Sequence, residues 1–164
     1  MFCAMRLNSE DGTIVELRVT GYQFPDLMGP HDFREGAYRD ANWLLVSGRV
    51  RKANGRGWAF SDPCLLVDEA QALTGWLRTA AAGRFPGYRR RDGSPLTFLE
   101  PNLRFALRAC DGDRVVVRVG FAHECGPDPR RGGRPAAVLL RMSPSGLAQA
   151  AGEWSEETAR FPRR

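Results

Sequence analysis

The chain has 164 residues, a formal net charge of +5 and 43% hydrophobic residues. This length suits one domain, so we expect a single domain over residues 1–164. The composition is that of a globular protein and excludes a collagen-like or wholly disordered chain. No apolar run approaches the roughly 20 residues that cross a bilayer, and the first residues do not form a leader peptide, so we expect a cytoplasmic location.

The basic charge is unevenly distributed. Residues 1–83 carry 9 basic and 10 acidic side chains, whereas residues 84–164 carry 15 and 9. The excess in the second half raises the question of an acidic partner or a nucleic acid. Lys52 is the only lysine among the basic residues. A GC-rich genome explains this bias, and a preference for bidentate phosphate binding is the alternative.

Alternating apolar and polar residues predict several antiparallel strands. Val15, Leu17 and Val19 alternate with polar side chains, and a partner strand precedes them through a turn at residues 9–12. Asn-Gly and Asp-Gly pairs supply the positive φ angles of hairpin turns. The first predicted hairpin joins residues 43–51 to 56–60 through Asn54-Gly55. The second joins 103–110 to 114–122 through Asp111-Gly112. One further strand is predicted at 137–142.

Two segments show helical periodicity instead. Residues 68–82 have one apolar face, with Asp68 as the expected cap and Gly83 as the end. Residues 144–160 follow Ser143 and Pro144, a typical helix start, and Pro162 prevents continuation. The sequence therefore predicts a mainly β, α+β fold: an antiparallel twisted sheet or sandwich of about seven or eight strands with two packed amphipathic helices.

Three long connections separate these elements, and long loops in compact domains are often functional. Residues 22–42 contain several aromatic side chains, whereas residues 84–95 and 123–135 are rich in arginine. The alternative is that all three are solvated loops with local disorder. We favour that interpretation for residues 123–135.

No motif for catalysis or cofactor binding is present. The sequence lacks Gly-x-Ser-x-Gly and a glycine-rich phosphate loop. Cys3, Cys64, Cys110 and Cys125 are widely spaced, so we expect no disulfide, no structural metal and no cofactor. A metal shared by His123 and Cys125 is the weaker alternative. An enzyme ranks behind binding functions for this chain.

Three acidic motifs share a similar form: Asp40-Ala-Asn42-Trp43, Asp62-Pro63-Cys64 and Glu100-Pro101-Asn102. Asp, Asn and Pro at strand ends usually close turns by bonding nearby backbone groups, and this is the favoured interpretation. Contact with a partner and acid–base catalysis are the alternatives.

An ordered set of motifs resembles the WapI family of bacterial immunity proteins. The set spans nearly the whole chain, and its most specific parts are Asp40-Ala-Asn-Trp43 and Glu100-Pro-Asn-Leu103. The remaining parts are Asp11–Leu17, Gly21–Pro25, Trp58–Leu65, the helical pattern of Glu69, Leu73, Trp76 and Leu77, Leu96–Leu99, the pattern of Leu147, Ala150, Ala151 and Trp154, and Phe161–Arg164.

The resemblance implies a non-catalytic cytoplasmic antitoxin that binds the toxin domain of a wall-associated, contact-dependent toxin. The founding toxin is a tRNA-cleaving nuclease, although the family does not imply the same toxin here. Under this interpretation an acidic toxin surface would suit the basic chain. We expect aromatic anchors and a charged rim at the interface: Tyr22, Phe24, Tyr38, Asp40, Asn42, Arg89, Arg90 and Arg91. For the aromatic residues, core packing beneath the long loop is an equally favoured interpretation. The alternative function is an RNA- or DNA-binding module acting through the arginine-rich loops.

Overall fold

The computed structural model describes residues 4–27, 35–85 and 93–164. Its strands form two four-stranded antiparallel sheets, β1-β2-β3-β4 and β5-β6-β7-β8. The strands are β1 (Met5–Asn8), β2 (Ile14–Tyr22), β3 (Trp43–Arg51), β4 (Gly57–Leu66), β5 (Gly93–Thr97), β6 (Leu103–Cys110), β7 (Val115–Phe121) and β8 (Ala136–Met142). The predicted mainly β, α+β fold with antiparallel strands is confirmed, and of the two arrangements left open by the sequence, one twisted sheet or a sandwich, the strands form two sheets.

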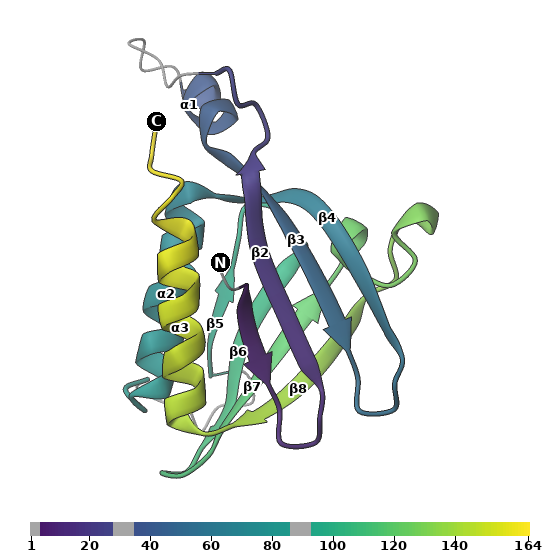
Figure 1. The fold of residues 1–164 in the computed structure, drawn as a ribbon, viewed down its shortest axis with the longest axis vertical. Helices are drawn as coiled ribbons and strands as arrows, with labels where there is room; N and C mark the ends of the chain where they lie inside the picture. The colour runs from purple at the N-terminus through teal and green to yellow at the C-terminus, as the bar shows by residue number, and fades with distance from the viewer. Residues whose placement is uncertain (1–3, 28–34, 86–92) are drawn as a thin grey trace.

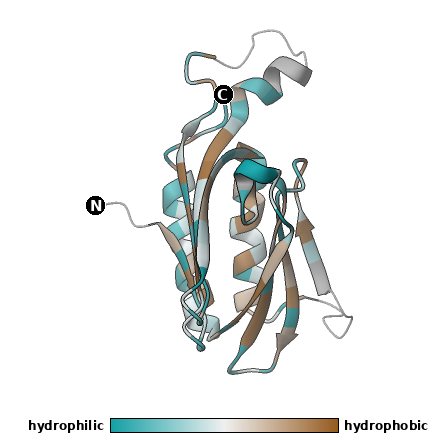
Figure 2. Ribbon diagram, turned by 90° about the vertical axis from the view of Figure 1, so that its right-hand side faces the viewer, coloured by the Kyte–Doolittle hydropathy of each residue, from teal (hydrophilic) through white to brown (hydrophobic). Residues whose placement is uncertain are grey.

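The α-helices are α1 (Glu35–Asn42), α2 (Val67–Ala81) and α3 (Pro144–Thr158), and the 3-10 turns are η1 (His123–Cys125) and η2 (Pro129–Arg131). The two sheets face each other, and α2 and α3 lie side by side along one open side between them (Figure 1). In Figure 2 hydrophobic segments lie on the strands and on one of the helices, whereas the turns at the lower ends of the strands are hydrophilic. No helix among the described residues is long and apolar enough to span a membrane.

The core lies between the two sheets and the helix pair. Trp154 of α3 is fully buried, and its indole N–H donates to the Ala70 carbonyl of α2 at 2.8 Å. Phe60 of β4 meets Phe121 of β7 across the core, with ring centroids 6.0 Å apart. Both tryptophans of the predicted helical faces, Trp76 and Trp154, are therefore core residues, as their helical spacing indicates.

Two contacts close the edge where β1 meets its neighbours. The Glu153 carboxylate of α3 accepts from the Arg6 backbone N–H at 3.1 Å, which satisfies the free edge of β1. Near the β1–β2 turn, the Glu10 N–H donates to the Arg141 carbonyl at 2.9 Å, and the Arg141 N–H donates to the Ser9 hydroxyl at 3.0 Å. The two sheets are thereby tied together at this corner.

Local signals fixed both predicted hairpin turns and the start of α3. Gly55 and Gly112 adopt φ angles of +80° and +67°, as their turns require. The Ser143 hydroxyl accepts from the Gly146 N–H at 3.1 Å and caps α3. The predicted cap of α2 is wrong, however. The helix starts after Leu66, and Glu69 accepts from the Leu66 N–H at 2.9 Å, leaving Asp68 inside the first turn.

The long connections hold more structure than the sequence indicates. Helix α1 occupies the end of the 22–42 segment, and β5 begins inside the 84–95 segment. The favoured interpretation of residues 123–135 as a locally disordered loop is also corrected. A side chain at Gly133 would overlap the His123 carbonyl, and the Arg134 N–H donates to Pro127 at 2.8 Å, so this loop is tightly folded.

Candidate partner-binding surfaces

Tyr22, a predicted partner-binding residue, holds the end of the chain. Its hydroxyl donates to the Pro162 carbonyl at 2.5 Å, and its ring meets Phe161 edge to face with centroids 5.5 Å apart. The Arg164 guanidinium lies 3.5 Å from the centre of the same ring, a cation–π contact. The half-buried side chain of Tyr22 is thus engaged within the chain.

Asn42, at the end of α1, completes the same arrangement. Its buried amide donates to the Arg164 carbonyl at 3.1 Å and accepts from the Arg164 N–H at 2.9 Å. The Arg164 guanidinium also donates to the carbonyls of Pro25 and Leu27, at 2.8 and 2.9 Å. We call Tyr22, Asn42 and Arg164 the terminal clasp. It fastens the chain end to the segment that follows β2.

The remaining predicted partner-binding residues fall into two groups. Phe24, with 41% of its surface exposed, and Asp40 both face solvent beside the terminal clasp. Partner contact through these two residues stays a prediction. Arg89, Arg90 and Arg91 lie outside the described residues, as does the side chain of Tyr38, whose backbone belongs to α1.

Two of the acidic motifs meet in space at the other side of the fold. The buried Asn102 amide donates to Asp62 at 3.0 Å and to Glu124 of η1 at 3.1 Å. Burial raises the pKa of the Asp62 carboxyl, and the negative charges of Glu124 and Glu100 raise it further. Asp62 also lies within β4, so the expected turn at Asp62-Pro63-Cys64 is wrong.

Two buried thiols lie beside Asp62. The ligand atoms of Asp62, Cys64 and Cys125 are all within 4.8 Å of one another, whereas His123, the expected alternative partner of Cys125, is not in this group. A hydrogen bond with Cys125 and burial raise the pKa of the Cys64 thiol. A metal requires the thiolate, and Asp62 is already bonded to Asn102. The absence of a structural metal therefore stays our prediction.

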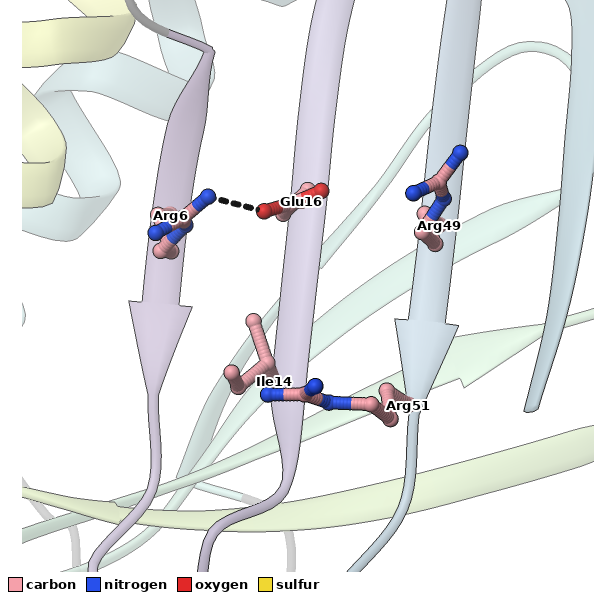
Figure 3. A pocket seen from close by; sticks show the side chains of 5 residues that line it. All are labelled: Arg6, Ile14, Glu16, Arg49 and Arg51. Carbon is pink, nitrogen blue, oxygen red and sulfur yellow. Dashed lines mark hydrogen bonds and ion pairs between the residues drawn. The ribbon is translucent and has the colours of Figure 1, made fainter. Parts of the chain in front are cut away.

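The outer face of the β1–β4 sheet carries a row of charged side chains. Arg6, Glu16 and Arg49 stand opposite one another on adjacent strands, and Ile14 stands opposite Arg51 in the next row. These residues line an open pocket of about 330 Å³ (Figure 3). Strand alternation is the sequence signal that indicates them, because each of these residues follows or precedes a buried residue.

The outer face of strands β6–β8 is basic without any acidic residue in those strands. Arg118 stands beside Leu139 in register, and 47% of the Leu139 surface is exposed. Arg104 and Arg141 are also exposed on these strands. Arginine beside exposed apolar surface is a composition typical of protein interfaces.

The fold and these surfaces define a mainly β, α+β protein with charged outer sheet faces. A family model described as the immunity protein WapI-like family matches residues 6–162. The chain therefore belongs to the WapI-like immunity protein family, which confirms the resemblance found in the sequence. No curated protein matches the sequence. Membership implies toxin neutralisation, a non-catalytic role and a protein toxin as partner.

Proposed function

We propose that the chain is a cytoplasmic immunity protein that neutralises a contact-dependent toxin by binding the toxin domain and occluding its active site. The observation that carries this proposal is the family match over residues 6–162, since it spans both sheets and all three helices. Stoichiometric binding is enough for inhibition, so no turnover is required.

The structure offers surfaces that suit such binding. A specific interface buries about 1,600 Å² in total, and a few aromatic and arginine side chains usually carry most of its energy. Exposed arginines occupy both outer sheet faces, and Phe24 is exposed beside the terminal clasp. Because the chain carries a net charge of +5, we infer that the bound toxin surface is acidic.

Titration against the toxin domain tests this proposal. The neighbouring gene is first inspected for a large secreted protein, and the chain is then coexpressed with the C-terminal toxin domain of that protein. An unrelated toxin domain serves as the control. We expect a complex with one chain per toxin domain and protection that saturates at that ratio. Full protection with far less than one chain per toxin domain, or chemical modification of the toxin, would show that the chain acts as an enzyme instead.

Nucleic-acid binding is the second candidate, and the basic β6–β8 face favours it. The exposed Arg130, Arg131 and Arg134 of the 123–135 loop add to the positive charge. Binding through phosphates releases counterions, so affinity for a short RNA or DNA should fall steeply as salt rises. Copurified nucleic acid at moderate salt would support this candidate.

A further inference from the structure

The pocket on the β1–β4 face contains two arginines, Arg49 and Arg51, whose guanidinium groups have no partner among residues 4–27, 35–85 and 93–164. Glu16 forms an ion pair with Arg6 on β1 rather than with Arg49, its opposite neighbour on β3. In Figure 3 the Arg49 side chain extends along β3 with no dashed line to Glu16, and the Arg51 side chain extends across toward Ile14. Within the described part of the chain, neither the Arg49 nor the Arg51 guanidinium has a hydrogen bond or ion pair. Both side chains are exposed.

The surface beside the pocket is also hollow. A second cavity of about 450 Å³ shares Glu16 and Arg49 with the first and extends over Ser47 and Ala59. Ala59 stands opposite Arg49 in the register of β3 and β4, and Ser61 stands opposite Ser47. These small residues leave the arginines accessible from the β4 side. A partner segment can therefore reach the guanidinium groups without displacing a larger side chain.

The charges in the pocket favour a carboxylate over a polyphosphate. An unpaired guanidinium presents a planar set of N–H donors that matches the two oxygens of a carboxylate. A phosphate backbone would bring a row of negative charges past the Glu16 carboxylate, which lies between Arg6 and Arg49. A single Asp or Glu side chain can bind Arg49 or Arg51 while leaving Glu16 with Arg6.

We propose, resting on the proposed function, that the β1–β4 face is the surface on which the toxin domain docks, with Arg49 and Arg51 binding an Asp or Glu side chain of that domain. The Ile14 side chain supplies apolar contact between the strands. The contact between these two arginines and the toxin carboxylate speeds association with the toxin domain and fixes its orientation, because complementary charges raise the association rate as well as the affinity.

Charge reversal tests this assignment against a matched control. The double variant Arg49→Glu/Arg51→Glu is compared with Arg104→Glu/Arg118→Glu on the β6–β8 face, which is the competing docking surface, since both variants change the net charge equally. Affinity for the toxin domain encoded beside the gene is measured by titration calorimetry, and folding by thermal unfolding. We expect the first variant to lose about 100-fold in affinity and the second less than about 5-fold, with similar melting temperatures.

The outcomes separate this proposal from the proposed function. If the unaltered chain binds and Arg49→Glu/Arg51→Glu binds equally well, the docking surface is wrong and the function stands. If the unaltered chain does not bind the toxin domain, both are wrong. A short single-stranded RNA is the final probe. Tight RNA binding that is lost in Arg49→Glu/Arg51→Glu would assign the pocket to nucleic acid and overturn the carboxylate proposal.

Discussion

The ring of Phe60 lies against the backbone of Gly48, its opposite neighbour in the register of β3 and β4. A Cβ atom at Gly48 would stand 2.2 Å from Phe60 Cζ and 2.3 Å from Cε1. Phe60 also meets Phe121 of the other sheet. Gly48 therefore gives the ring room to join the two sheets, a role of glycine in strands where a side chain approaches the backbone closely.

We expect Gly48→Ala to destabilise the fold by about 2 kcal/mol, because the added methyl group forces the Phe60 ring out of the core. Gly21→Ala is the matched control, since Gly21 also lies in a strand and has nothing within 4 Å of its Cβ position. Urea unfolding at equilibrium measures both. Equal midpoints for the two variants would contradict the packing argument.

The terminal clasp predicts a stabilising role for Arg164. We expect Arg164→Ala to cost about 1–2 kcal/mol, because it removes the cation–π contact with Tyr22 and hydrogen bonds to Pro25 and Leu27. Hydrogen exchange should also accelerate at residues 22–27. Arg163→Ala is the control and should cost less than about 0.5 kcal/mol, since the Arg163 side chain is 61% exposed and its ion pair with Asp68 is 3.9 Å long. Unchanged exchange in Arg164→Ala would argue against the clasp.

Tyr22 and Phe24 should respond differently to truncation. Tyr22→Ala should lower the free energy of unfolding by about 2 kcal/mol, because the ring and hydroxyl both contact the chain end. Phe24→Ala should change stability by less than about 0.5 kcal/mol, since the ring is 41% exposed. Thermal unfolding separates the two variants. If Phe24 is an anchor, Phe24→Ala should weaken toxin binding at unchanged stability.

The raised pKa of Asp62 predicts a pH dependence of stability. Because this pKa is higher in the folded state than its ordinary value of 3.8, the folded protein binds the proton more tightly. Stability then falls as pH rises from 3.8 through the raised pKa. Asp62→Asn, which keeps an acceptor for Asn102, should flatten this slope. It should also add less than about 1 kcal/mol at neutral pH, since solvent screens the partly exposed carboxyl.

Asp11 provides a control of opposite sign for that experiment. A hydrogen bond from the Thr13 backbone N–H, 2.9 Å long, lowers the pKa of the Asp11 carboxyl. Its contribution to stability is present above 3.8 and is lost as pH falls through the lowered pKa. Asp11→Asn should therefore reduce the melting temperature at neutral pH. A higher melting temperature of Asp11→Asn at neutral pH, or a lower one of Asp62→Asn, would contradict the directions given for the two pKa shifts.

Thiol labelling tests the cysteine environment. Cys110 is partly exposed, whereas Cys64 and Cys125 are buried, and the raised pKa of Cys64 keeps it protonated. We expect a thiol reagent to label Cys110 at least about tenfold faster than Cys64 or Cys125 in the folded protein. Peptide mass spectrometry gives the site of labelling, and metal analysis is done on the same sample. Stoichiometric zinc at Asp62, Cys64 and Cys125 would show that our prediction of no structural metal is wrong.

Features that depend on neighbouring residues were predictable from the sequence. Asn54-Gly55 and Asp111-Gly112 close their hairpins because glycine accepts the positive φ of the turn. Ser143 and Pro144 start α3 for equally local reasons. The alternation in β2 also follows from the sequence, since a strand with one buried face repeats every second residue. The antiparallel fold class rests on these signals.

Only the tertiary structure determined helix α1, strand β5 and the contacts between residues far apart in the sequence. The short helix α1 contains few apolar residues, and Asn42 at its end is buried against Arg164, 122 positions away. β5 is defined by pairing with β6. Asp62 meets Asn102 across 40 positions, and the Arg49 pocket requires the register of three strands. Neighbouring residues determine where the chain turns and which side of each strand is apolar. Which distant residues that side contacts is determined only when the strands align and the core packs.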